Sequence, residues 1–214
     1  MRRLDDFQID PRQLHDELAA FRAFLGEPTK ELSEREHVLP FFKAHRNLAA
    51  LVGYAHSTIH EPTVLKSELE IFGDWACDLA VGNHANGEFC FVEFENAAPD
   101  SVFRRGSRKG VPDWSARLEH GLSQISDWFY HLTCNAHTPQ FRSFFGTDLA
   151  HYGGLLVIGR DAFLAEDELH RLRWRAQNTL IAGKRIGIVT FDGLLHALAA
   201  RAKMIPRPRR KPKS

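Results

Sequence analysis

Apolar residues are spaced along the chain as in helices in some segments and as in strands in others. The segment Pro11 to Leu25 predicts a helix, because apolar residues at helical spacing form one stripe along it: Leu14, Leu18, Phe21 and Leu25. A second helical segment begins near Ser33 and includes "EREHVLPFFKAHRNLAALVG", in which Pro40 would kink or divide the helix.

Strand-like runs dominate the next part of the chain. We expect one strand around Val64 to Phe72, followed by a strand pair within "DLAVGNHANGEFCFVEFE", Asp78 to Glu95. After a Gly/Arg/Lys loop, "FRRGSRKGVPD", a long helix is expected from about Asp113 to Leu132, with Asp113 as a plausible N-cap.

The last third of the chain alternates between the two kinds of element. "GGLLVIGR" and "RIGIVTFD" predict short buried strands, "EDELHRLRWRAQNTL" an amphipathic helix, and "GLLHALAARAK" a closing helix. The order of elements predicts an α/β fold with a mixed sheet flanked by helices. We divide the chain into an N-terminal helical extension (residues 1–29), one α/β domain (30–203) and a basic, disordered tail (204–214).

Charge is unevenly distributed over the 214 residues. The net charge is +1, yet the last fourteen residues carry seven of the 28 Lys and Arg residues and no acid, so the rest of the chain is acidic. Such a tail either contacts nucleic acid or aids solubility. The sequence lacks a signal-like start and any apolar stretch of membrane-spanning length, and its three cysteines form no disulfide framework, so we expect a cytoplasmic protein with no membrane partner.

Three carboxylates stand in or next to the apolar strand pair: Asp78, Glu93 and Glu95. With a two-residue turn at Asn86-Gly87, Asp78 would face Glu95, whereas a four-residue loop would place it opposite Glu93. Either even-length loop puts all three acids on one face, because strand side chains alternate.

The acids share their face with Phe89 and Phe91, which is typical of a cleft rather than of a solvated edge. Carboxylates so close together destabilise a hairpin unless a cation neutralises them, and oxygen ligands suit a divalent ion. The residues alone therefore favour a metal site over the alternative, an edge hairpin with a solvated acidic face. A zinc site built on Cys134 and His137 is a less favoured alternative.

An acid at the start of a hairpin followed by paired acids on its second strand is similar to the core of PD-(D/E)XK nucleases. More specifically, residues of about 30 to 200 resemble the nuclease domain of the Shedu anti-phage defence family. The matching pieces occur in the family's order: "EREHVLPFFKAHRNLAALVG", "DLAV", "FVEFENAAPDSVFRRG", "LEHGLSQISDWFYHL", "LLVIGR" and "IVTFDGLL".

The resemblance implies a restriction-endonuclease-like fold in which Asp78 and Glu93 bind Mg²⁺ or Mn²⁺. Glu95 stands where the superfamily has lysine, so it would ligate a second ion, act as general base, or mark a site without catalysis. Gln124 resembles the family's helix glutamine. A further acid is expected from the first core helix, with Glu36 as first choice. Glu34 and Glu68 are the alternatives to it.

The basic loop that follows the acidic strand should emerge near the cleft. The cations of this loop would bind the phosphate backbone of a nucleic acid, and they are Arg104, Arg105, Arg108 and Lys109. Arg160, outside the loop, is a weaker candidate for the same role. The expected function is thus metal-dependent DNA hydrolysis in anti-phage defence, by an assembly of several copies. The alternative is a catalytically degenerate module of the same fold that binds nucleic acid or acts as a regulated scaffold.

Overall fold

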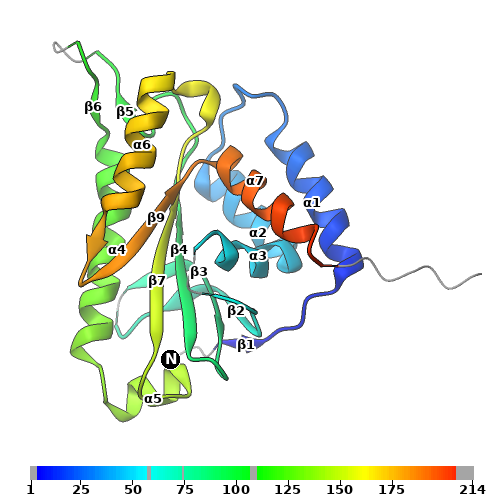
Figure 1. The fold of residues 1–214 in the computed structure, drawn as a ribbon, viewed down its shortest axis with the longest axis vertical. Helices are drawn as coiled ribbons and strands as arrows, with labels where there is room; N and C mark the ends of the chain where they lie inside the picture. Colours follow the sequence, from blue (N-terminus) through cyan, green and yellow to red (C-terminus); the bar gives the residue numbers. More distant parts are fainter. Residues whose placement is uncertain (1–3, 57–58, 74, 107–109, 206–214) are drawn as a thin grey trace, which may run out of the picture.

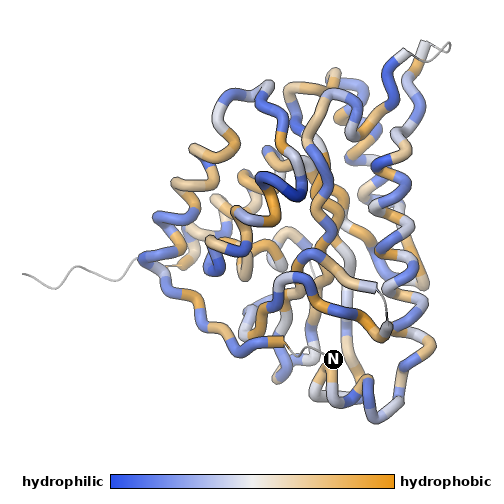
Figure 2. Tube along the Cα trace, turned by 180° about the vertical axis from the view of Figure 1, so that it is seen from behind, coloured by the Kyte–Doolittle hydropathy of each residue, from blue (hydrophilic) through white to orange (hydrophobic). Residues whose placement is uncertain are grey.

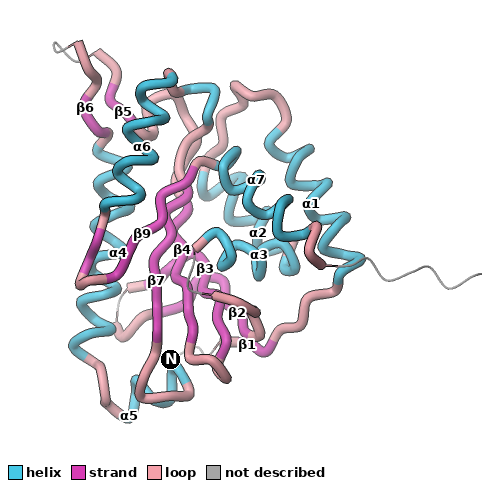
Figure 3. Tube along the Cα trace, in the orientation of Figure 1, coloured by secondary structure: helices cyan, strands magenta, loops and turns pink. Residues whose placement is uncertain are grey.

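A mixed seven-stranded sheet lies between two layers of helices in the computed structural model (Figures 1 and 3). The structure describes residues 4–56, 59–73, 75–106 and 110–205. The expected α/β fold with a mixed sheet flanked by helices, consistent with a restriction-endonuclease-like fold, is confirmed. Within the described residues, no helix is long and apolar enough to pass through a bilayer.

The sheet has the order β1-β2-β3-β4-β7-β9-β8. Its strands are β1 (Asp5–Asp6), β2 (Val64–Glu70), β3 (Ala76–Asn83), β4 (Glu88–Phe94), β7 (His151–Val157), β8 (Leu180–Ile181) and β9 (Lys184–Val189). β4, β7 and β9 are parallel neighbours and the other pairs are antiparallel. A separate short hairpin joins β5 (Phe103–Arg104) to β6 (Asp113–Trp114).

One helical layer packs on the face of β4 that carries Val92 and Phe94. It consists of α1 (Pro11–Leu25), α2 (Leu39–Ala44), α3 (Arg46–Val52) and α7 (Phe191–Ala202) (Figure 1). The expected apolar stripe of α1 is buried in this core, together with residues of α7. Helix α1 therefore shares one core with the α/β domain.

The other layer covers the face that carries Phe89 and Phe91. It consists of α4 (Ala116–Cys134), α5 (Pro139–Phe145) and α6 (Glu166–Asn178). Apolar and polar positions alternate along these helices, so that each turns an apolar stripe to the sheet (Figure 2). Short helical turns fill three connections, η1 (Glu34–Val38), η2 (Gly53–Ala55) and η3 (Asp161–Phe163).

One local alternative is decided and one local prediction is wrong. The β3–β4 hairpin has the four-residue loop and not the two-residue turn, because Asn83 pairs with Glu88. The Asn83 side chain stabilises this loop by accepting hydrogen bonds from the backbone N–H groups of Ala85 and Asn86. Helix α4 begins at Ala116 with Ser115 as its N-cap, since the expected cap, Asp113, lies in β6.

Arg160 is a structural residue and not a phosphate ligand as expected. Only 2% of it is exposed. Its guanidinium makes two hydrogen bonds with the Asp192 carboxylate, at 2.9 and 3.0 Å, and donates to the carbonyls of Leu25 and Lys30. Arg160 thereby ties the end of α1 to the first turn of α7.

Replacing Asp192 with alanine should destabilise the fold by about 3 kcal/mol, because it leaves a buried guanidinium without its counter-charge. The matched control is Asp148→Ala, which breaks the solvent-exposed Arg142–Asp148 pair and should change stability far less. Urea denaturation of both variants measures the difference. Equal destabilisation would contradict the role given to Arg160.

Candidate active site

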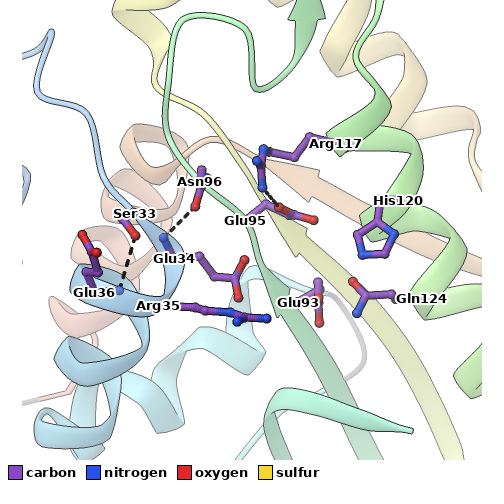
Figure 4. Close-up of a pocket in the computed structure, with 10 residues that line it drawn as sticks. All are labelled: Ser33, Glu34, Arg35, Glu36, Glu93, Glu95, Asn96, Arg117, His120 and Gln124. Carbon is purple, nitrogen blue, oxygen red and sulfur yellow. Dashed lines mark hydrogen bonds and ion pairs between the residues drawn. The ribbon is translucent and has the colours of Figure 1, made fainter.

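A pocket of about 450 Å³ lies at the carboxyl end of β4, between the π-helical turn η1 and the first half of α4 (Figure 4). Because β4, β7 and β9 run parallel in that order, this is the sheet edge at which α/β proteins commonly bind ligands. The pocket is lined by Ser33, Glu34, Arg35, Glu36, Glu93, Glu95, Asn96, Arg117, His120 and Gln124.

The strand register fixes the position of the first two acids. Leu79 pairs with Val92, so continuing the register by one residue sets Asp78 opposite Glu93. Glu93 points to the α4 face, since its neighbours Val92 and Phe94 belong to the core on the opposite face. Asp78 lies close enough for its charge to raise the pKa of Glu93, in agreement with the proximity expected from the sequence.

Glu93 is the most strongly perturbed acid of the pocket. It is only 5% exposed, and burial, followed by the charges of Asp78 and Glu95, raises the pKa of Glu93 to about 10. Hydrogen bonding from Gln124 acts in the opposite direction. Glu93 Oε2 and Gln124 Oε1 are both buried without a hydrogen-bond partner. Each of these two residues therefore keeps one buried oxygen without a partner.

Burial also raises the pKa of Asp78, to about 7, despite the hydrogen bond that its carboxylate accepts from the backbone N–H of Phe94 at 2.8 Å. The negative charges of Glu34 and Glu95 act in the same direction as burial. Asp78 and Glu93 therefore form a pair that repels further negative charge and would be stabilised by a cation.

Glu95 has a different environment. It is 2% exposed and lies just beyond the end of β4, where its backbone N–H donates to the Val157 carbonyl. Its carboxylate accepts a hydrogen bond from Nη1 of Arg117 at 2.9 Å. The charge of this third acid is therefore already compensated by a cation from α4.

Glu34 and the first choice, Glu36, both line the pocket, and the geometry favours Glu34 as the acid that faces Glu93. Ser33 caps the π-helical turn and accepts a hydrogen bond from the backbone N–H of Glu36, while the backbone N–H of Glu34 donates to the Asn96 side chain at 2.7 Å. This turn directs the Glu34 carboxylate towards Glu93 and leaves Glu36 exposed on the outer side (Figure 4).

Electrostatic contacts agree with this placement. Burial, and next the charge of Glu95, raises the pKa of Glu34, and the charge of Glu34 in turn helps to raise the pKa values of Asp78 and Glu93. The remaining alternative, Glu68, is exposed and forms an ion pair with Lys43 at 2.8 Å.

The unpaired atoms at the pocket fit a hard divalent cation, because both of them, Glu93 Oε2 and Gln124 Oε1, are oxygens. Across the described part of the chain, no three His, Cys, Asp or Glu side chains form a group that could hold a metal ion as they stand. The three-carboxylate set expected from the sequence is thus not assembled, since Glu95 is paired with Arg117. Magnesium commonly uses one or two carboxylates and several waters, which Asp78 and Glu93 could supply.

The zinc alternative at Cys134 and His137 gains no support, because among the described residues neither takes part in a group of three side chains that could hold a metal ion.

The basic loop is only partly beside the pocket. Arg104 is exposed and lines an adjoining pocket of about 390 Å³ together with Arg105 and Arg117. Arg105 is held by an ion pair with Glu168 at 2.6 Å and by the carbonyl of Phe163. The other two expected phosphate ligands, Arg108 and Lys109, lie outside the described residues.

Sequence reasoning missed Arg117, although a signal was present. Arg117, His120 and Gln124 stand at helical spacing on one edge of α4, and all three line the pocket. Helical spacing counted back from Gln124, the residue expected from the sequence, would have included His120 and Arg117.

The two raised pKa values predict how stability depends on pH. In the unfolded chain both carboxyl groups lose their protons above a pH of about 4. In the folded protein the pKa of Asp78 is about 7 and that of Glu93 about 10, so the folded state keeps protons that the unfolded state has released. The contribution of both groups to stability therefore falls as pH rises. Relative to the wild type, Asp78→Asn should therefore gain stability up to about pH 7 and Glu93→Gln up to pH 9, each by at most about 1.4 kcal/mol per pH unit. Denaturation in chelator measures this, and a difference that is constant with pH would contradict it.

Comparison with known proteins gives one match. The model of the family described as Shedu protein SduA, C-terminal, matches residues 31–195. A search of curated proteins finds no match. The matched range includes η1, the β3–β4 hairpin and α4, which are the elements that build the pocket. The chain therefore belongs to the family of Shedu SduA C-terminal domains.

Proposed function

We propose that the chain is a Mg²⁺- or Mn²⁺-dependent nuclease that hydrolyses phosphodiester bonds in DNA. Membership of the Shedu family suggests a role in anti-phage defence. The observation that carries the proposal is the buried Glu93 carboxylate, which faces Asp78 and Gln124 with one oxygen unpaired. Strongly perturbed acids at the edge of a pocket are typical of catalytic sites.

In this proposal Asp78 and Glu93 hold the metal ion, with Gln124 Oε1 beside them. When bound, the ion supplies Lewis-acid polarisation of the phosphate and lowers the pKa of a water molecule. Glu34 lies across the pocket from Glu93 and accepts a proton from the attacking water. Its raised pKa brings its proton affinity closer to the neutral range, as a general base requires.

One observation favours the alternative, a degenerate module that binds nucleic acid or acts as a scaffold. Glu95 is paired with Arg117, and the described residues contain no ready three-residue ligand group. Such a module would keep the pocket but would respond neither to metal nor to the loss of its acids.

Thermal melts separate the two functions. Mg²⁺ or Mn²⁺ should stabilise the wild type relative to chelator, by about 2.7 kcal/mol at one hundred times the dissociation constant. Asp78→Asn and Glu93→Gln should lose this stabilisation, because each removes a charged ligand. DNA cleavage should fall by on the order of 100-fold or more in both variants, since even the outer partners of a metal ligand are worth about 10- to 100-fold.

Two further variants serve as a matched pair. Glu34→Gln and Glu36→Gln each neutralise one acid of the same turn, but only Glu34 faces the acids of β4. Cleavage should fall in the first variant and persist in the second. Melts that are identical with Mg²⁺, Mn²⁺ and chelator would contradict the nuclease proposal and favour the scaffold.

A further inference from the structure

Arg117 lies where two pockets meet. It lines the acidic pocket with Glu34, Glu93 and Glu95, and it also lines the adjoining pocket with Arg104 and Arg105. Its side chain is 42% exposed, although the carboxylate that it contacts is buried. Arg117 therefore lies between the acidic pocket and the adjoining pocket lined by Arg104 and Arg105.

The ion pair with Glu95 fixes the guanidinium without using up its donors. The contact employs Nη1, and a guanidinium presents five N–H donors in a rigid plane. Glu95 itself is held by its backbone hydrogen bond to Val157 at the end of β4. Glu95, buried directly after the end of β4, therefore orients Arg117, whose remaining N–H donors are accessible from solvent.

Electrostatics explains why such a residue is needed here. A phosphodiester that enters this pocket passes the acids Glu34 and Glu95, and the cation that compensates Glu95 lines the same entrance. Arginine suits phosphate because its planar fork donates two parallel hydrogen bonds to two oxygens.

We propose that Arg117 is the phosphate-positioning residue of this pocket. A DNA phosphate that enters from the side of Arg104 binds the outward N–H groups of Arg117, while Glu95 keeps the guanidinium in place. This inference rests on the proposed function for its substrate, but it assigns to Arg117 and Glu95 roles that are separate from metal binding.

The test is the salt dependence of binding to a short DNA duplex, measured by fluorescence anisotropy in chelator, so that neither metal nor cleavage contributes. In Arg117→Gln the slope of log K against log salt should decrease by about 1, because one phosphate contact is lost. Arg142→Gln is the matched control, since it removes the same charge from an exposed ion pair outside both pockets and should keep the wild-type slope.

Two more variants exclude a merely structural effect. Glu95→Gln/Arg117→Gln removes both charges of the pair, so it leaves no buried acid unpaired and should show the same reduced slope as Arg117→Gln. Arg117→Lys keeps the charge, and should keep the slope while lowering kcat at least about tenfold with little change in KM, because lysine is a point charge. A wild-type slope in the double variant, or wild-type kcat in Arg117→Lys, would overturn the inference.

The outcomes distinguish this inference from the proposed function. A reduced slope without any metal response would keep Arg117 as a phosphate ligand in a binding module and would reject the nuclease. A clear metal response with an unchanged slope would keep the nuclease and would reject the role of Arg117.

Discussion

The burial of the Glu93 carboxylate at the end of the central strand is the constraint on which the site depends. A buried acid is stable as an anion only beside a cation or several hydrogen-bond donors, and otherwise it keeps its proton. Here burial and the neighbouring acids raise the pKa of Glu93 to about 10, so the metal-free protein holds this group neutral near pH 7. The pocket therefore holds a buried carboxyl group that ionises near pH 7 only when a cation is bound beside it.

The fold builds this arrangement from segments that are distant in sequence. The antiparallel β3–β4 pair brings Asp78 opposite Glu93, and the parallel β4–β7 pair holds β4 inside the sheet, where its acids are buried. Helix α4 closes one side with Gln124 and Arg117. On the other side, hydrogen bonds between Leu32 and Ala97 hold η1, and with it Glu34, at the end of β4.

The sequence predicted those parts of the site that depend on periodicity. Strand alternation placed Asp78 and Glu93 on one face whichever loop joined the strands, and the family resemblance pointed to Gln124. What the sequence left open or missed depended on local geometry. The Asn83 side chain stabilises the four-residue loop rather than a two-residue turn at Asn86-Gly87.

The remaining errors have the same origin. A π-helical turn rotates Glu34 rather than Glu36 towards the pocket, and no periodicity reveals such a turn. The tertiary contacts that bury Arg160 and that pair Glu95 with Arg117 join residues 22 or more positions apart, and these partners are not visible in a single sequence.

Isothermal titration calorimetry of Mg²⁺ or Mn²⁺ binding at pH 7 tests the account most directly. A carboxyl group must lose its proton to ligate a metal, and Glu93 is protonated and Asp78 about half protonated at this pH. The account predicts saturable binding whose heat changes with the ionisation enthalpy of the buffer, in proportion to the release of about one to two protons. Saturable heats that are the same in all buffers, or no saturable heat, would contradict it.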